Sequence, residues 1–64
     1  MLIPHRIIVK LGKFSGQSAE VYDFRCYYPS NVYTLKARLE NGKKITVNEL
    51  DVDVISHQEV DIDN

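Results

Sequence analysis

Hydrophobic and polar residues alternate most clearly between residues 32 and 47. Four apolar positions there face one way and four polar positions face the other, which predicts a β-strand with one face in a core and one in water. The apolar positions are Tyr33, Leu35, Ala37 and Leu39, and the polar positions are Thr34, Lys36, Arg38 and Glu40. The same alternation resumes after Asn41-Gly42, so the segment predicts a β-hairpin.

The loop of this hairpin is predicted to hold three residues, 40–42. A two-residue loop would pair core-facing with solvent-facing positions, because a slip of one residue moves every side chain to the other face. A three-residue loop pairs apolar positions across the strands and puts Gly42 in the left-handed position of a bulged turn, where glycine has no steric cost. The inward pairs are then Ala37 with Ile45 and Leu35 with Val47.

The rest of the chain predicts three more strands and one turn of helix. The strands are expected over residues 6–11, 19–28 and 51–55, with Pro4 marking the start of the first and the helical turn at residues 48–50. Loops are expected over residues 12–18 and 29–31, where glycine, proline and asparagine occur. In the second strand, one set of side chains is expected inward, opposite Leu39, Ala37, Leu35 and Tyr33 in that order: Tyr22, Phe24, Cys26 and Tyr28.

Five short strands close most easily into a small, partly open barrel, which removes exposed edges. Sixty-four residues allow a single domain, for which we expect a barrel over residues 1–56 and a flexible acidic tail over residues 57–64. The single cysteine excludes a disulfide within the chain, and the first residues contain no long apolar run typical of a signal peptide or membrane span. We therefore expect a cytoplasmic protein.

Charge is unevenly distributed along the chain, whose formal net charge is −1. Residues 1–50 contain all eight lysines and arginines and four of the nine acids, whereas residues 51–64 contain five acids and no lysine or arginine. Two interpretations of the acidic end stay open: a solvated segment that aids solubility, or a segment that shields the basic body or binds a partner.

No residue set predicts catalysis or a metal site. His5, His57 and Cys26 are isolated and lack the paired spacings of zinc ligands. Cys26 is expected on the inward face as an inert core thiol, without the neighbouring base that a nucleophile needs. The acidic pairs at residues 51/53 and 61/63 are expected to be solvated. The sequence therefore predicts a binding module with no catalytic activity, metal, cofactor or small-molecule substrate.

Basic residues on the outer face of the hairpin are a candidate surface for RNA or DNA. Phosphate contacts from lysine and arginine, with interleaved aromatic rings for base stacking, suit a groove that follows a nucleic-acid backbone. Lys10 and Arg25 would extend the surface, and Phe14 either folds onto the core or contacts the ligand. The predicted contact residues are Lys13, Phe14, Tyr27, Lys36, Arg38, Lys43 and Lys44. The alternative is that these cations only keep the barrel soluble and prevent its strand edges from pairing with other chains.

The stretch from residue 9 to residue 21 resembles a KOW motif. That family has an apolar strand followed by a pattern G-x-F-x-G-x-x-G-x-V, and Gly12, Phe14, Gly16 and Val21 stand at matching places. The layout up to residue 54 or 55 is similar to the KOW domain of bacterial transcription elongation and antitermination factors. The resemblance implies an SH3-like barrel and contact with nucleic acid or with a transcription or translation assembly.

Protein binding is the rival function. Tyrosine is favoured in interfaces, because one end of its side chain is apolar and the other forms hydrogen bonds. The chain has four tyrosines, and a small barrel can pair an exposed strand edge with a partner. The alternative is therefore a homodimerising domain or a small accessory or inhibitor protein of a mobile element.

Overall fold

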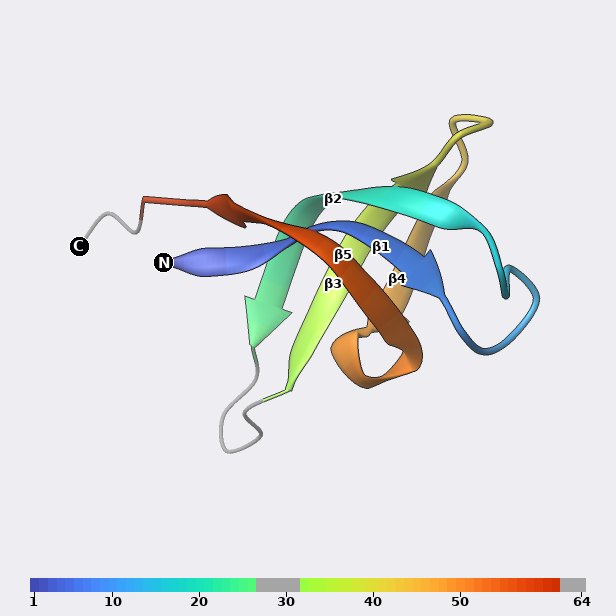
Figure 1. The fold of residues 1–64 in the computed structure, drawn as a ribbon, viewed down its shortest axis with the longest axis horizontal. Coiled ribbons are helices and arrows are strands. Elements are labelled where there is room, and N and C mark those ends of the chain that lie inside the picture. Colours follow the sequence, from blue (N-terminus) through green and yellow to red (C-terminus); the bar gives the residue numbers. More distant parts are fainter. Residues whose placement is uncertain (27–31, 62–64) are drawn as a thin grey trace.

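The computed structural model describes residues 1–26 and 32–61, which form one five-stranded antiparallel sheet (Figure 1). The strands are β1 (Leu2–Val9), β2 (Ser18–Cys26), β3 (Tyr33–Leu39), β4 (Lys44–Asn48) and β5 (Val52–Glu59), in the spatial order β4-β3-β2-β1-β5. A single 3₁₀ turn, η1 (Glu49–Asp51), precedes β5. The predicted all-β class, the number of strands and the helical turn before the last strand are confirmed.

The sheet encloses one apolar core. β1 and β5 cross in front of β3 and β4 in Figure 1, and side chains from all five strands pack together between them. Phe14, Phe24, Tyr33 and Val47 pack partly buried around this core. The buried residues of the core are Ile7, Val9, Ala19, Val21, Leu35, Ala37, Leu39, Ile45 and Val52.

The β3–β4 hairpin has the predicted register. Ala37 lies opposite Ile45 and Leu35 opposite Val47, so apolar side chains meet across the strands. Gly42 has a φ of +89°, and its N–H donates to the carbonyl of Leu39 at 2.9 Å, which closes the three-residue loop. The turn therefore fixes which side chains of both strands face outward.

The predicted inward face of β2 is wrong in its first half, up to Tyr22. A register shift between Val21 and Asp23 leaves Tyr22 without a partner on β3, as in a β-bulge. Val21, expected outward, is buried, whereas Tyr22 is 47% exposed. Because the bulge changes which residues face inward, both Val21 and Phe24 contribute to the core side.

The predicted pairing of β2 with β3 is also wrong, by two residues of β3. Phe24 lies opposite Leu35 rather than Ala37, and Cys26 lies opposite Tyr33. Cys26 is the last residue of β2 and is exposed, so the expectation of a core thiol is wrong. Tyr27, Tyr28 and the predicted turn at 29–31 lie outside the described residues.

The two terminal strands pair further along than predicted. β1 begins at Leu2 and β5 continues to Glu59, so residues 57–59, expected in a frayed tail, belong to a strand. Pro4 lies inside β1, at a point where β1 pairs with β5 but its pairing with β2 has not begun. A proline is tolerated there because a missing N–H on that side breaks no ladder hydrogen bond.

A side chain on β5 ties this end of the sheet together. The amide of Gln58 donates from Nε2 to the carbonyls of Pro4 on β1 and Val21 on β2, at 3.1 and 3.2 Å.

Within the described residues, no helix has the length and apolar character needed to cross a membrane.

Candidate nucleic-acid interface

The outward side of the β3–β4 hairpin carries a row of cations. Arg38 lies directly opposite Lys44, and Lys36 lies opposite Thr46. Like charges directly opposite one another on a sheet are destabilising. No acidic side chain in the described ranges forms an ion pair with Lys36, Arg38 or Lys44, so their positive charge stays available at the surface.

Tyr22 lies over this row. The Arg38 Cζ and the Lys44 Nζ are each 5.7 Å from the centre of its ring. A cation at this distance from an aromatic face is attracted by the ring's quadrupole, by about 0.5–1 kcal/mol at exposed sites. The bulge in β2 thus places an exposed aromatic ring among cations that would otherwise only repel one another.

Phe14 forms a second group of the same kind. The Lys43 Nζ lies 5.0 Å and the Lys13 Nζ 5.8 Å from the centre of the Phe14 ring. The loop that carries Phe14 is closed by backbone hydrogen bonds, including the Gly16 N–H to the Val9 carbonyl at 2.7 Å. Phe14 is half-buried against the core, so it covers the core and also lies beneath two lysines.

We call this surface the basic face, defined by five cations and two rings: Lys13, Lys36, Arg38, Lys43, Lys44, Phe14 and Tyr22. Lys43 and Lys44 are consecutive, so the two aromatic groups lie against neighbouring residues beside the β3–β4 turn. Tyr27, the ring predicted for stacking, lies outside the described residues.

Lys10 and Arg25, the two other cations suggested by the sequence, have different surroundings from the cations of the basic face. The Lys10 Nζ forms an ion pair with Asp53 Oδ1 at 3.7 Å, which neutralises it. Arg25 is exposed and lies opposite Thr34, further along β2 than Tyr22.

Tyr22 is the functional candidate that sequence reasoning missed. Strict alternation placed it in the core. The signal was present in β2, where Ala19 and Val21 fall on one face and Phe24 on the other. Side chains of opposite faces can pack into the same core only if one residue between them bulges out of the regular pairing.

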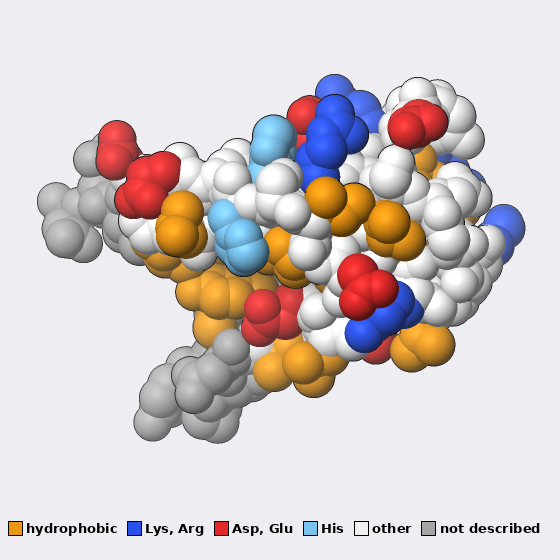
Figure 2. All heavy atoms as spheres, viewed as in Figure 1, with side chains coloured by type: hydrophobic (Ala, Val, Ile, Leu, Met, Phe, Trp, Pro, Cys, Tyr) orange, Lys and Arg blue, Asp and Glu red, His pale blue; other side chains and the backbone are white. Residues whose placement is uncertain are grey.

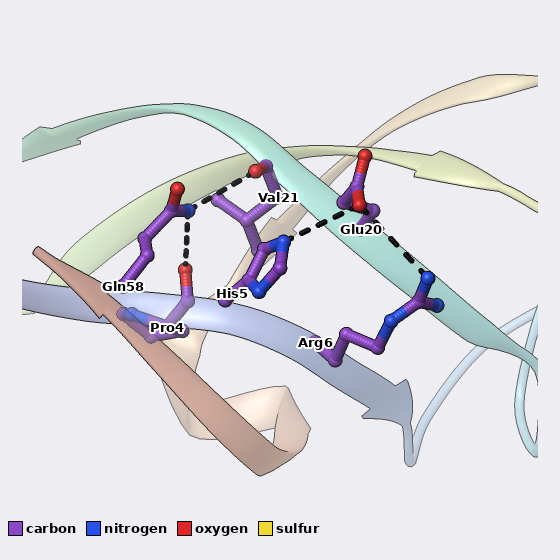
Figure 3. Close-up of polar contacts among 6 residues, drawn as sticks. All are labelled: Pro4, His5, Arg6, Glu20, Val21 and Gln58. Carbon is purple, nitrogen blue, oxygen red and sulfur yellow. Dashed lines mark hydrogen bonds and ion pairs between the residues drawn. The ribbon is translucent and has the colours of Figure 1, made fainter.

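Acidic side chains border the basic face on its β2 side. Glu20 lies directly opposite Arg38 on β3 and Arg6 on β1. Its Oε2 is 3.3 Å from His5 Nε2 and 3.9 Å from Arg6 Nη2, as Figure 3 shows. Glu40 accepts a hydrogen bond from the Ser18 hydroxyl at 3.1 Å. The basic face therefore ends at carboxylates that other side chains hold in place.

Comparisons of the chain with models of known protein families, with curated proteins and with solved structures found no match. The resemblance to the KOW family stays a prediction. Among the described residues, no group of three or more His, Cys, Asp or Glu side chains is placed to hold a metal ion. The fold and the surface thus define a small all-β protein with an aromatic, cationic face.

Proposed function

We propose that this protein binds nucleic acid through the basic face, with a preference for single strands. The observation that carries the proposal is the pairing of an exposed ring, Tyr22, with two cations, Arg38 and Lys44, that no described acid neutralises. Proteins that bind single strands combine these two elements, since cations contact phosphates and rings stack on bases. In a duplex the bases already stack on one another, so Tyr22 would add little.

The number of cations sets the expected salt dependence. Each phosphate contact to a single strand contributes about −0.7 to the slope of log affinity against log salt. Four or five contacts predict an affinity that falls roughly 50- to 130-fold between 50 and 200 mM salt. Stacking on Tyr22 would add a component that is far less sensitive to salt.

The test is fluorescence anisotropy with a labelled single-stranded RNA, a single-stranded DNA and a duplex DNA, each at two salt concentrations. Lys44→Glu should weaken binding strongly, and Tyr22→Ala should weaken it by about fivefold or more while Tyr22→Phe retains it. Lys10→Glu is the matched control, because it changes the net charge equally at a lysine that already pairs with Asp53. Equal losses in Lys44→Glu and Lys10→Glu would show a response to net charge alone. Absence of binding at high micromolar protein and low salt would refute the proposal.

A second candidate function, binding of a protein strand, is favoured by β5. This strand is at one edge of the sheet, and Val54 and Ile55 on it are 38% and 57% exposed. Figure 2 shows the side of the molecule where β1 and β5 run, with hydrophobic side chains between histidine and acidic ones. An exposed edge strand with apolar side chains can add a strand from a partner or from a second copy.

Sedimentation velocity at increasing protein concentration tests the version with a second copy. Self-association through β5 should persist in high salt and disappear in Ile55→Lys, whereas nucleic-acid binding should be unchanged in that variant. A monomer at all concentrations would leave only a different protein as the partner of β5.

A further inference from the structure

A small hollow adjoins the basic face and shares Arg38 with it. It has a volume of about 170 Å³ and lies on the outer side of β1, β2 and β3, at the start of the β3–β4 turn. Its lining residues are Arg6, Ala19, Glu20, Arg38, Leu39 and Glu40. Sites for whole drug-sized ligands are roughly 300–1,000 Å³, so this hollow has room for one small planar group such as a base.

Glu20 is one of the two carboxylates that line this hollow. By register it is opposite Arg38 on β3 and Arg6 on β1, and its carboxylate pairs with Arg6 while the Arg38 guanidinium lies over Tyr22. Figure 3 shows His5 and Arg6 directed at Glu20 from β1, and both contacts involve Oε2. Glu20 Oε1 has no partner among the residues that the structure describes, and the side chain is 51% exposed. The carboxylate is therefore oriented by its neighbours and still open to a ligand.

Arg38 connects the hollow to the stacking ring. It lines the hollow, and its guanidinium carbon is 5.7 Å from the centre of Tyr22. A base stacked on Tyr22 would therefore have its neighbour along the strand close to Glu20. This neighbouring base would meet the Glu20 carboxylate as an acceptor and the arginines of the hollow, Arg6 and Arg38, as donors.

We propose that this hollow, with Glu20 as the specificity-determining residue, selects guanine in a single strand bound to the basic face. Guanine is the only common base whose Watson–Crick edge has two adjacent donors, N1–H and N2–H₂, beside an acceptor, O6. A carboxylate can accept from both donors, here with Glu20 Oε1 open and Oε2 giving up its contact with His5 or Arg6, and an arginine donates to O6. Adenine, cytosine and uracil each place an acceptor where the carboxylate needs a donor.

The inference rests on the proposed function, and the experiment separates the two. Three labelled RNA nonamers are compared by anisotropy: uridine throughout, one central guanosine, and one central inosine, which lacks only the N2 amino group. The guanosine strand should bind about fivefold or more tightly than the inosine strand. This comparison uses the unmodified protein, so it does not depend on whether a variant folds.

Glu20→Gln should remove the preference for guanosine over inosine while slightly raising the affinity for the uridine strand, because a negative charge near the phosphates is lost. Glu59→Gln is the matched control, since it loses the same charge at the far end of β5 and should keep the preference. Salt-sensitive binding of all three strands with equal affinity would overturn the guanine proposal and leave the proposed function standing. Persistence of the preference in Glu20→Gln would also overturn it. Binding of none of the strands would overturn both.

Discussion

Replacing Gly42 with valine measures the free energy that a residue with a side chain costs at the left-handed position of the hairpin turn. Gly42 has a φ of +89°, and its surroundings are open, with no atom within 4 Å of the position a Cβ would occupy. The cost of a side chain therefore comes from the backbone conformation and not from a clash. An L-residue in the left-handed region costs roughly 1–2 kcal/mol, and a β-branched residue is among the least tolerant.

In a domain of 60–100 residues, 1 kcal/mol shifts the melting temperature by about 4–8 °C. Gly42→Val should therefore lower the Tm by roughly 5–15 °C, which thermal unfolding followed by circular dichroism would measure. Gly42→Asn is the control, because asparagine visits the left-handed region more readily and should retain most of the stability. A valine variant that melts within about 2 °C of the native protein would refute the reasoning, and so would equal losses for valine and asparagine.

The remaining predictions concern one half-buried and one exposed polar group. Gln58→Met keeps the side-chain length but removes the donors to the carbonyls of Pro4 and Val21, so it should cost about 1–3 kcal/mol in urea unfolding. An unchanged urea midpoint would show that water replaces both contacts at no cost. Cys26 is exposed, so a maleimide should modify it in native buffer without denaturant. Protection until the protein unfolds would place the thiol in the core after all.

The β3–β4 hairpin could be predicted from the sequence because its information is local. The loop length, the glycine and the two alternating runs all lie within residues 32–47, and only one register satisfies them together. The positions of Lys36, Arg38, Lys43 and Lys44 followed from that register. The cationic part of the candidate site was therefore predictable.

β2 could not be predicted by alternation alone. A bulge shifts the alternation by one residue at a point set by packing against β3, and strict alternation cannot represent it. This one residue accounts for the errors at Val21 and Tyr22, whereas Cys26 is exposed at the end of β2. The aromatic part of the site was missed for the same reason.

The ends of β1 and β5 were underestimated because their pairing is the most distant in the sequence. Leu2 pairs with Glu59, and the N-terminal amine forms an ion pair with the Glu59 carboxylate. Neither segment has a strong alternating pattern by itself. Each segment forms a strand because it pairs with the other. The local sequence pattern of either segment alone does not reveal this pairing.

The last prediction follows from Tyr22 having no partner on β3. Deleting Tyr22 joins Val21 to Asp23, whose partners Ala37 and Lys36 are already consecutive on β3. Every inward side chain of β2 then keeps its partner, so the shortened protein should fold into a regular sheet with a cooperative melt. It should lose affinity for single-stranded RNA at least as far as Tyr22→Ala does, because the ring between Arg38 and Lys44 is gone.

Deleting Glu20 is the control, because it shortens β2 by the same one residue within a regularly paired stretch. It would shift Ala19 and the residues before it by one position, move core side chains to the surface and abolish the cooperative melt. If both deletions unfold the protein, the bulge is needed for the twist of the sheet. If deletion of Tyr22 folds but still binds RNA as tightly, the ring is not the stacking surface. A folded protein without affinity would show that the extruded residue serves binding and not the fold.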